Sequence, residues 1–299
     1  MAYLQLGLDA YSPREISEKV QSVGVSKARL PFLQTAMLGV LAGAFIGLGA
    51  LYFTIVASDA TLGFAATRVL GGLVFSLGLI LVSVGGAELF TGNNLMVMAW
   101  ADGKITAAEL LRNWTVVYLA NALGAVGLAL TVYLAHHGSM NGGAVGAAYV
   151  KIAAAKTALP FDEAFFKGVL CNLLVCLAVW LAMAGRTVVD KILAIVFPVS
   201  AFVAAGFEHS VANMYFIPLG LLLADSATLP ATVNLASLGW AGLTSNLVAV
   251  TLGNIVGGSG MVALVYYLVY RRSALAHPRT GAERTRASDS PVEAAKPVE

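Results

Sequence analysis

Long apolar runs without charge constrain this chain more than any other feature of its sequence. The residues between Arg29 and Asp59 include no charged side chain, and comparable runs follow. Hydrophobic residues make up 59% of the chain and charged residues only 11%, whereas a soluble domain carries about 25% charged residues. So little charge does not cover a globular surface, which argues against a soluble enzyme. The net charge of +2, without a basic stripe, also argues against a nucleic-acid partner.

We expect an all-α membrane protein with six transmembrane helices, because each apolar run reaches the roughly 20 residues needed to cross the bilayer. Glu88 interrupts the second run and Glu208 interrupts the fifth. No signal peptide is expected, since the first apolar run is long enough to remain as a span. The predicted spans cover about 33–57, 69–99, 113–136, 164–184, 190–223 and 244–270.

The distribution of lysine and arginine predicts how the chain is oriented. Six spans place both termini on one side, and that side receives fourteen of the eighteen basic residues. Because cytoplasmic loops are enriched in lysine and arginine, we predict a multi-pass protein of the inner (plasma) membrane with both termini in the cytoplasm. The four basic residues on the outer side can attract anions; they are Arg68, Lys151, Lys156 and Lys167.

Three segments are predicted from composition. Residues 1–30 form a cytoplasmic segment in which 12–28 is an amphipathic helix at the membrane surface, with Ile16, Val20 and Val23 on one face. Residues 31–272 form the six-span domain. Residues 273–299, rich in Pro, Ala, Ser, Glu and Arg, are predicted to be a disordered cytoplasmic tail.

The two interrupted spans carry the same pattern, which predicts an inverted repeat. Residues 86–93 read GAELFTGN and residues 206–213 read GFEHSVAN, both Gly-x-Glu-x4-Asn. A second echo relates LANALG at 119–124 to LGNIVG at 252–257. Spans one to three therefore correspond to spans four to six, and an odd number of spans inverts the second copy. Broken second and fifth helices near the midplane are a common way to build a transport site, because helix ends attract small anions.

His209 is the strongest functional candidate, because an ionisable group at membrane depth needs a reason to be there. It can give a hydrogen bond or a proton to a passing anion, or it can be a buried neutral histidine satisfied by a neighbour. Glu88 and Glu208 suit a proton relay less well than a structural role, in which each carboxylate accepts hydrogen bonds from the amides of its own loop. Asn93 and Asn213 are interpreted as loop fasteners.

Other polar residues in the apolar runs allow two interpretations each. The Thr91 hydroxyl can face a pore or bond back to its own helix. Asn172 can orient His209 or bridge two helices, and Lys156 can attract anions or lie solvated among headgroups. The remaining polar residues are assigned structural roles. Asn121 and Asn254 are predicted to hydrogen-bond between helices. Cys171 and Cys176 are predicted to be small buried side chains, and no metal site or cofactor is expected.

Large apolar side chains surround the interrupted segments. Most such residues are ordinary packing, yet a hydrophobic constriction on each side of a polar centre also excludes hydrated ions from a pore. The adjacent Glu208, His209 and Ser210 do not form a hydrolase relay, because neighbours on one segment point in different directions. The large apolar residues are Phe75 and Leu79 before the first interruption, Leu89 and Phe90 within it, and Phe202 before the second.

Three blocks resemble the formate/nitrite transporter family: ELFTG at 88–92, KGVLCNLLVCLAVW at 167–180 and GFEHSVANM at 206–214. The resemblance covers roughly residues 15–272. It implies an aquaporin-like six-span fold that assembles as a homopentamer, with one pore in each protomer. It also implies site residues: the central His209, the loop Thr91, the nearby Asn172, the vestibule Lys156, a periplasmic slit of Phe75 and Phe202, and a cytoplasmic slit of Leu79, Leu89, Phe90 and Val175.

The function that the resemblance implies is transport of formate, linked to protons through His209, rather than enzyme catalysis. Nitrite and hydrosulfide are the alternatives, since all three are small anions of weak acids. The choice between a channel and a secondary transporter stays open. A pore for neutral solutes would need two Asn-Pro-Ala loops, which the sequence lacks. A purely structural membrane protein would not need His209 and two carboxylates at membrane depth.

Overall fold

The computed structural model describes residues 10–225, 227, 229 and 233–272. Within these residues, six helical segments are long and apolar enough to cross a membrane, which confirms the predicted number of spans. The predicted tail beyond 272 lies outside the described residues. The six segments are Phe32–Ala57 (α2), Phe64–Gly85 (α3), Ala107–Leu134 (α6), Phe161–Ala184 (α8), Val188–Ala205 (α9) and Trp240–Arg271, which begins with α11 (Trp240–Ile255), continues as a π-helix over Val256–Leu264 and includes α12 (Val265–Tyr267).

The second and fifth spans are both interrupted. After α3, the chain resumes as the short helices α4 (Phe90–Asn93), a 3-10 turn over Asn94–Met96 and α5 (Val97–Ala101). After α9, it resumes as α10 (Ser210–Leu223). Each first half ends on a glycine in the left-handed region, Gly86 with φ 82° and Gly206 with φ 77°. That conformation is strained for a residue with a Cβ atom, so glycine is the residue that lets the helix stop there.

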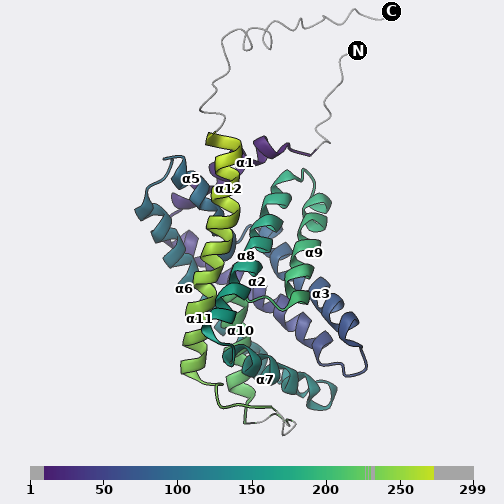
Figure 1. The fold of residues 1–299 in the computed structure, drawn as a ribbon. Helices are drawn as coiled ribbons and strands as arrows, with labels where there is room; N and C mark the ends of the chain where they lie inside the picture. Colours follow the sequence, from purple (N-terminus) through teal and green to yellow (C-terminus); the bar gives the residue numbers. More distant parts are fainter. Residues whose placement is uncertain (1–9, 226, 228, 230–232, 273–299) are drawn as a thin grey trace, which may run out of the picture.

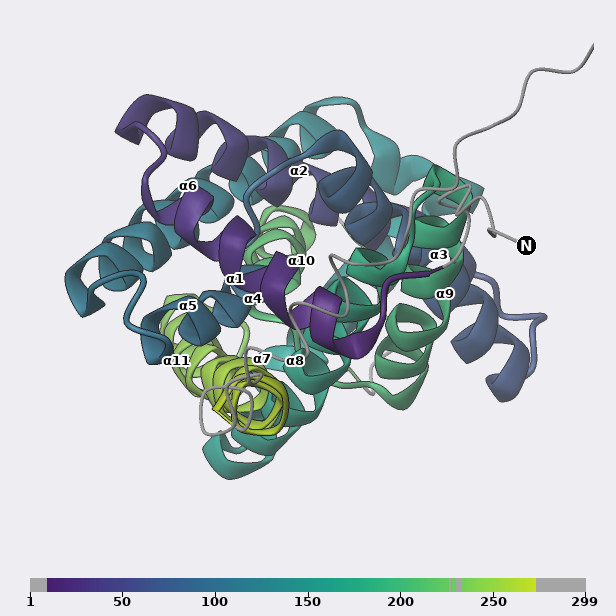
Figure 2. The ribbon, with the colours of Figure 1, turned by 90° about the horizontal axis from the view of Figure 1, so that it is seen from above.

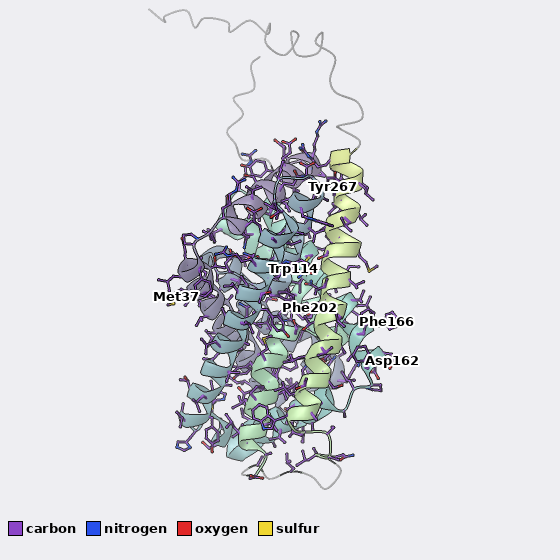
Figure 3. The ribbon with its side chains drawn as sticks, turned by 90° about the vertical axis from the view of Figure 1, so that its left-hand side faces the viewer. Met37, Trp114, Asp162, Phe166, Phe202 and Tyr267 are labelled. Atoms are coloured by element: carbon purple, nitrogen blue, oxygen red, sulfur yellow. The ribbon has the colours of Figure 1, made fainter. Side chains whose placement is uncertain are left out.

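Small residues set how closely the spanning helices approach. A Cβ atom on Gly43 of α2 would overlap the backbone carbonyl of Asn121 in α6, and one on Gly124 of α6 would overlap that of Val40. Lipid supplies no hydrophobic force between helices, so close packing at small residues holds them together. Figure 3 shows the resulting division, in which Phe202 lies inside the bundle whereas Met37 and Phe166 point outward.

The N-terminal helix α1 (Pro13–Ala28) begins with a capping box, in which the Ser12 hydroxyl accepts from the Glu15 amide and the Glu15 carboxylate accepts from the Ser12 amide. It lies across one end of the bundle, which Figure 2 views from above. Ile16 and Val20 are buried and Val23 is partly buried. This apolar face packs against α5, α8 and the 3-10 turn. The protein itself therefore covers the face that we expected at the membrane surface.

A further helix, α7 (Ala144–Thr157), was not predicted from the sequence. It connects α6 to α8 and packs against α10, at the opposite end of the molecule from α1 (Figure 1). Its apolar run is too short for a span. Two 3-10 turns precede it, His137–Ser139 and Asn141–Gly143, and the second contains Gly142 and Gly143. The molecule thus has an α1 end and an α7 end. The first and last described segments, α1 and Leu268–Arg272, both lie at the α1 end.

The close α2–α6 contact predicts a clear effect of one added methyl group. Gly124→Ala should lower the unfolding free energy by about 1–3 kcal/mol, because the new Cβ overlaps the Val40 carbonyl and the helices must separate. Gly127→Ala on the same helix is the matched control, since open space surrounds that position. It should be neutral or slightly stabilising. Thermal unfolding of the detergent-purified variants measures both effects, and equal midpoints would contradict the prediction.

Candidate functional site

Two cavities enter the protein from opposite ends, and each lies against one interrupted span. The cavity at the α1 end has a volume of about 290 Å³ and is lined by residues that include Lys27, Leu79, Glu88 and Leu89. The cavity at the α7 end has a volume of about 330 Å³ and is lined by residues that include Phe75, Lys156, Phe202, Glu208 and His209. The two interruptions therefore lie between the cavity that enters from the α1 end and the cavity that enters from the α7 end.

A polar pair from the two interruptions is buried between these cavities. The Nε2 atom of His209 lies 2.9 Å from the Thr91 hydroxyl, and neither residue exceeds 2% exposure. The Nδ1 atom of His209 accepts a hydrogen bond from the Ala212 amide at 3.1 Å and so caps α10. An accepting Nδ1 carries no proton, so the neutral ring bears its proton on Nε2. This Nε2–H group donates a hydrogen bond to the Thr91 hydroxyl. The Thr91 hydroxyl therefore faces His209 rather than its own helix.

Asn172 of α8 holds the Thr91 backbone. Its side-chain amide donates to the Thr91 carbonyl at 3.2 Å and to the Asn254 carbonyl at 2.7 Å. The Cys176 thiol donates to the same Thr91 carbonyl at 3.4 Å. Among the described contacts Asn172 has no hydrogen bond to His209, so of the two interpretations open from the sequence, the structure has the one in which Asn172 bridges helices.

The two buried carboxylates have side-chain partners instead of the loop amides that we expected. Glu88 accepts from Lys27 at 2.7 Å and from Asn93 at 2.7 Å. Glu208 accepts from Lys156 at 2.8 Å and from Asn213 at 2.7 Å. Each carboxylate is thus neutralised by one lysine and fastened to the helix that follows its own interruption. Lys156 is consequently paired, neither freely solvated nor free to meet an anion alone.

Asn121 and Asn254 satisfy the backbone of the two interruptions. Asn121 accepts from the Phe90 amide at 2.9 Å and donates to the carbonyls of Glu88 and Gly39. Asn254 accepts from the Ser210 amide at 3.0 Å and donates to the Glu208 carbonyl and to that of a glycine in α8. These residues link helices as predicted. They also pair groups that the broken helices leave free, which is obligatory at membrane depth.

The second half of the chain repeats the bonds of the first half. The partners that sequence reasoning missed are Lys27 on α1, Asn113 on α6 and Asn246 on α11. Asn113 accepts from Asn93 at 2.9 Å, and Asn246 accepts the equivalent bond at 2.7 Å. Asn113 and Asn246 are separated by the same number of residues as Asn121 and Asn254, so this shared spacing could have identified them. The matched bonds support the repeat that the two Gly-x-Glu-x4-Asn motifs predicted.

The large apolar residues occupy several environments. Phe75 and Phe202 contact each other edge to face at 5.8 Å and line the α7-end cavity, where the Phe202 ring also stacks on His209 at 6.1 Å. Leu79 and Leu89 line the α1-end cavity. Two further residues expected in the slit line neither of these cavities: Phe90, which packs against Trp114 and Tyr118 of α6, and Val175, which is buried in the core.

Both cavities are basic at their openings. Lys19, Lys27 and Lys191 line the α1-end cavity, and burial together with the positive charges of Lys191 and Arg186 lowers the pKa of Lys19. Arg68, Lys156 and Lys167 line the α7-end cavity. Each cavity also has one glutamate in its lining, Glu88 or Glu208, so the lining charges of each cavity sum to a net positive value. A cleft with a net charge concentrates ligands of the opposite sign. The cavities therefore favour small anions.

A six-span bundle with two interrupted spans and a buried polar pair between two basic cavities defines a class of membrane transport protein. The chain belongs to the formate/nitrite transporter family, whose pattern matches residues 14–268. It is 39% identical over 273 residues to the formate channel FocA of Escherichia coli, covering 88% of this chain and 96% of that one. It is 36% identical to the probable formate transporter of Methanothermobacter thermautotrophicus, covering 89% of this chain and 99% of the relative.

Solved structures of the same family have the same fold. One, described as a pentameric formate channel with formate bound, is 38% identical and superposes with a TM-score of 0.73 over 80% of this chain and 97% of its own. Another, described as an FNT family ion channel, is 30% identical with a TM-score of 0.74 over 85% of this chain and 98% of its own. The expected family and six-helix membrane fold are therefore confirmed.

The buried Lys156–Glu208 pair predicts a large loss of stability when one partner is removed. Lys156→Gln should cost about 3–5 kcal/mol, because the Glu208 side chain is only 6% exposed and would keep an unpaired charge. The matched control is Lys167→Gln, which breaks a more exposed pair with Glu163 and should cost about 0–1 kcal/mol. Chemical denaturation in detergent measures both values. The double variant Lys156→Gln/Glu208→Gln should recover part of the loss; a double variant no more stable than the single one would refute this account.

Proposed function

We propose that this protein transports formate across the inner membrane through a pore in each protomer, and that it is not an enzyme. The observation that carries the proposal is the buried His209–Thr91 pair between two basic cavities. The names of the relatives support formate as the substrate. In this proposal the α1 end is cytoplasmic, together with both termini, and the α7 end faces the periplasm.

The energetic difficulty is the passage of charge through an apolar constriction. A bare anion pays many kcal/mol to leave water for such a region. Formate is the anion of a weak acid with a pKa of roughly 3–4, so a proton can travel with it and neutralise it. We propose that transport is proton-linked in this way. The basic residues of the cavities concentrate the anion, and it crosses the slits between Phe75, Phe202, Leu79 and Leu89 as formic acid.

The geometry of His209 supports a hydrogen-bonding role at the centre of this path. A charged imidazolium needs a proton on Nδ1. That proton would point at the N–H group of Ala212, whose hydrogen bond Nδ1 accepts in this structure. The neutral ring keeps this cap and leaves its Nε2–H to donate, to Thr91 at rest and to the substrate in passage. In this proposal the transported proton comes from water in the α7-end cavity together with the anion.

The proposed assembly is a homopentamer in the lipid bilayer. One structural neighbour is described as pentameric. Exposed apolar residues cover the outer faces of α2, α6 and α8, including Met37, Leu119 and Phe166. Such faces suit contact with lipid or with neighbouring protomers. The domain assignment follows the same proposal, with residues 31–272 as the pore and residues 1–30 as a cytoplasmic segment.

Nitrite is the second candidate substrate, because the description of the family names both anions. Uptake into proteoliposomes under an imposed pH gradient separates the candidates. We expect saturable formate uptake that accelerates when the outside is acid, with nitrite and hydrosulfide competing weakly. Protein-free liposomes are the control for passive diffusion of formic acid. Fast nitrite uptake without formate uptake would overturn the substrate assignment and keep the anion pore.

His209→Asn tests whether the histidine gives a hydrogen bond or a proton. An asparagine amide still donates a hydrogen bond but exchanges no proton. We expect the maximal formate rate to fall by about tenfold, since one hydrogen bond is weakened, whereas the acceleration by external acid remains. His209→Leu, which has no donor, should abolish uptake. Loss of the acid dependence in His209→Asn would instead assign an obligatory proton transfer to the histidine.

A further inference from the structure

Arg68 carries the uncompensated charge of the α7-end cavity. It lies near the start of α3 and lines the cavity together with Lys156 and Lys167. Lys156 pairs with Glu208 at 2.8 Å, and Lys167 pairs with a glutamate one turn earlier in α8 at 2.6 Å. Within the described part of the chain, no carboxylate lies within salt-bridge distance of Arg68. An anion that enters this cavity therefore meets one unpaired cation.

The guanidinium of Arg68 is held in a fixed position. Its Nε atom donates to the Ala204 carbonyl in the last turn of α9 at 2.7 Å. Its Nη2 atom would lie 2.6 Å from a Cβ atom on Gly206, so the group rests directly against the turn that begins the second interruption. Among the described residues neither Nη atom has a hydrogen-bond acceptor. Both terminal NH2 groups are thus available in the cavity that leads to His209.

We propose that Arg68 is a specificity-determining residue that binds planar anions with two oxygen atoms at the α7-end opening. This inference rests on the proposed function and names the anion class that the opening selects. A guanidinium presents parallel N–H groups that match two oxygens on one centre, as in formate and nitrite. Hydrosulfide has a single acceptor atom and gains no second bond. A lysine at the same position would offer only a point charge.

The α1-end cavity supplies an internal comparison. Lys191 lies in the first turn of α9, the second-half counterpart of α3, and it lines the α1-end cavity together with Lys19. The α7-end cavity is therefore lined by the guanidinium of Arg68, whereas the α1-end cavity is lined by the ammonium of Lys191. Selection between two-oxygen and single-atom anions should act on anions that enter from the α7 end and not on those that enter from the α1 end.

A purely structural role for Arg68 would be to cap the C-terminal carbonyls of α9. That role affects stability and affects all transported anions alike. Selectivity between anions distinguishes it from binding. The test compares Arg68→Lys, which keeps the charge and loses the fork, with Arg68→Gln. Lys151→Gln is the matched control, because Lys151 is an exposed cation of α7 outside the cavity lining.

The measurement is the half-saturation concentration and maximal rate for formate, nitrite and hydrosulfide in right-side-out and inverted vesicles. For Arg68→Lys in right-side-out vesicles, we expect half-saturation for formate and nitrite to rise about tenfold, as for the loss of one charge-assisted bond. The maximal rate and the hydrosulfide values should change less than about twofold, as should every value in Lys151→Gln. Arg68→Gln should weaken all three anions, and formate and nitrite most.

Three results would overturn the inference: Arg68→Lys equal to wild type, an equal change for all three anions, or a wild-type preference for two-oxygen anions that is the same in both vesicle orientations. The last comparison needs no variant, so it decides the matter even where a substitution impairs folding. Wild-type protein that carries nitrite but no formate would refute formate as the substrate. The change in nitrite half-saturation caused by Arg68→Lys, compared with that for hydrosulfide, would then support or overturn the Arg68 inference. Wild-type protein that carries hydrosulfide alone would overturn both.

Discussion

The structure depends on satisfying two helices that stop inside the membrane. Each stop leaves N–H and C=O groups without helical partners, and the lipid around the bundle has no donor or acceptor to bond them. Asn121 and Asn254 supply both a donor and an acceptor to these groups, and each also reaches a carbonyl on a neighbouring span. Lipid tails give helices no hydrophobic reason to associate, so these polar bonds and the close glycine contacts fix the positions of the spans.

The buried carboxylates extend the same constraint to the ends of the molecule. Glu88 and Glu208 are tolerated because each has a lysine and an asparagine within hydrogen-bond distance. The lysines come from α1 and α7, which are too short to span a membrane. These two helices are therefore part of the pore frame, each bound to the interrupted span that opens toward its own end. A change in the position of either helix would move an interruption and the polar pair between the cavities.

The sequence was most informative where a single rule of membrane solvation applied. The spans follow from length and absence of charge, and the interruptions follow from glutamates inside apolar runs beside Gly86 and Gly206. It was least informative where partners come from distant segments. Nothing local to Lys27 marks it as the partner of Glu88, because the bond joins residues 61 positions apart. The helix carrying Lys156 was missed because its apolar run is short.

A symmetric frame makes the asymmetric positions functionally meaningful. When Glu88 is matched to Glu208, the position of His209 corresponds to Leu89, and that of Thr91 to Val211. The polar pair thus takes one residue from each half at positions that are not equivalent, which yields one central pair where a fully symmetric molecule would have two. His209 lines the α7-end cavity, whereas Leu89 lines the cavity at the α1 end. In the proposed path, an anion from the α7 end therefore meets a hydrogen-bond donor in the wall of its own cavity, and one from the α1 end meets leucine at the equivalent position. The repeated bonds hold both halves alike, and in the proposed path the differences between the halves make the chemistry depend on the end from which an anion enters.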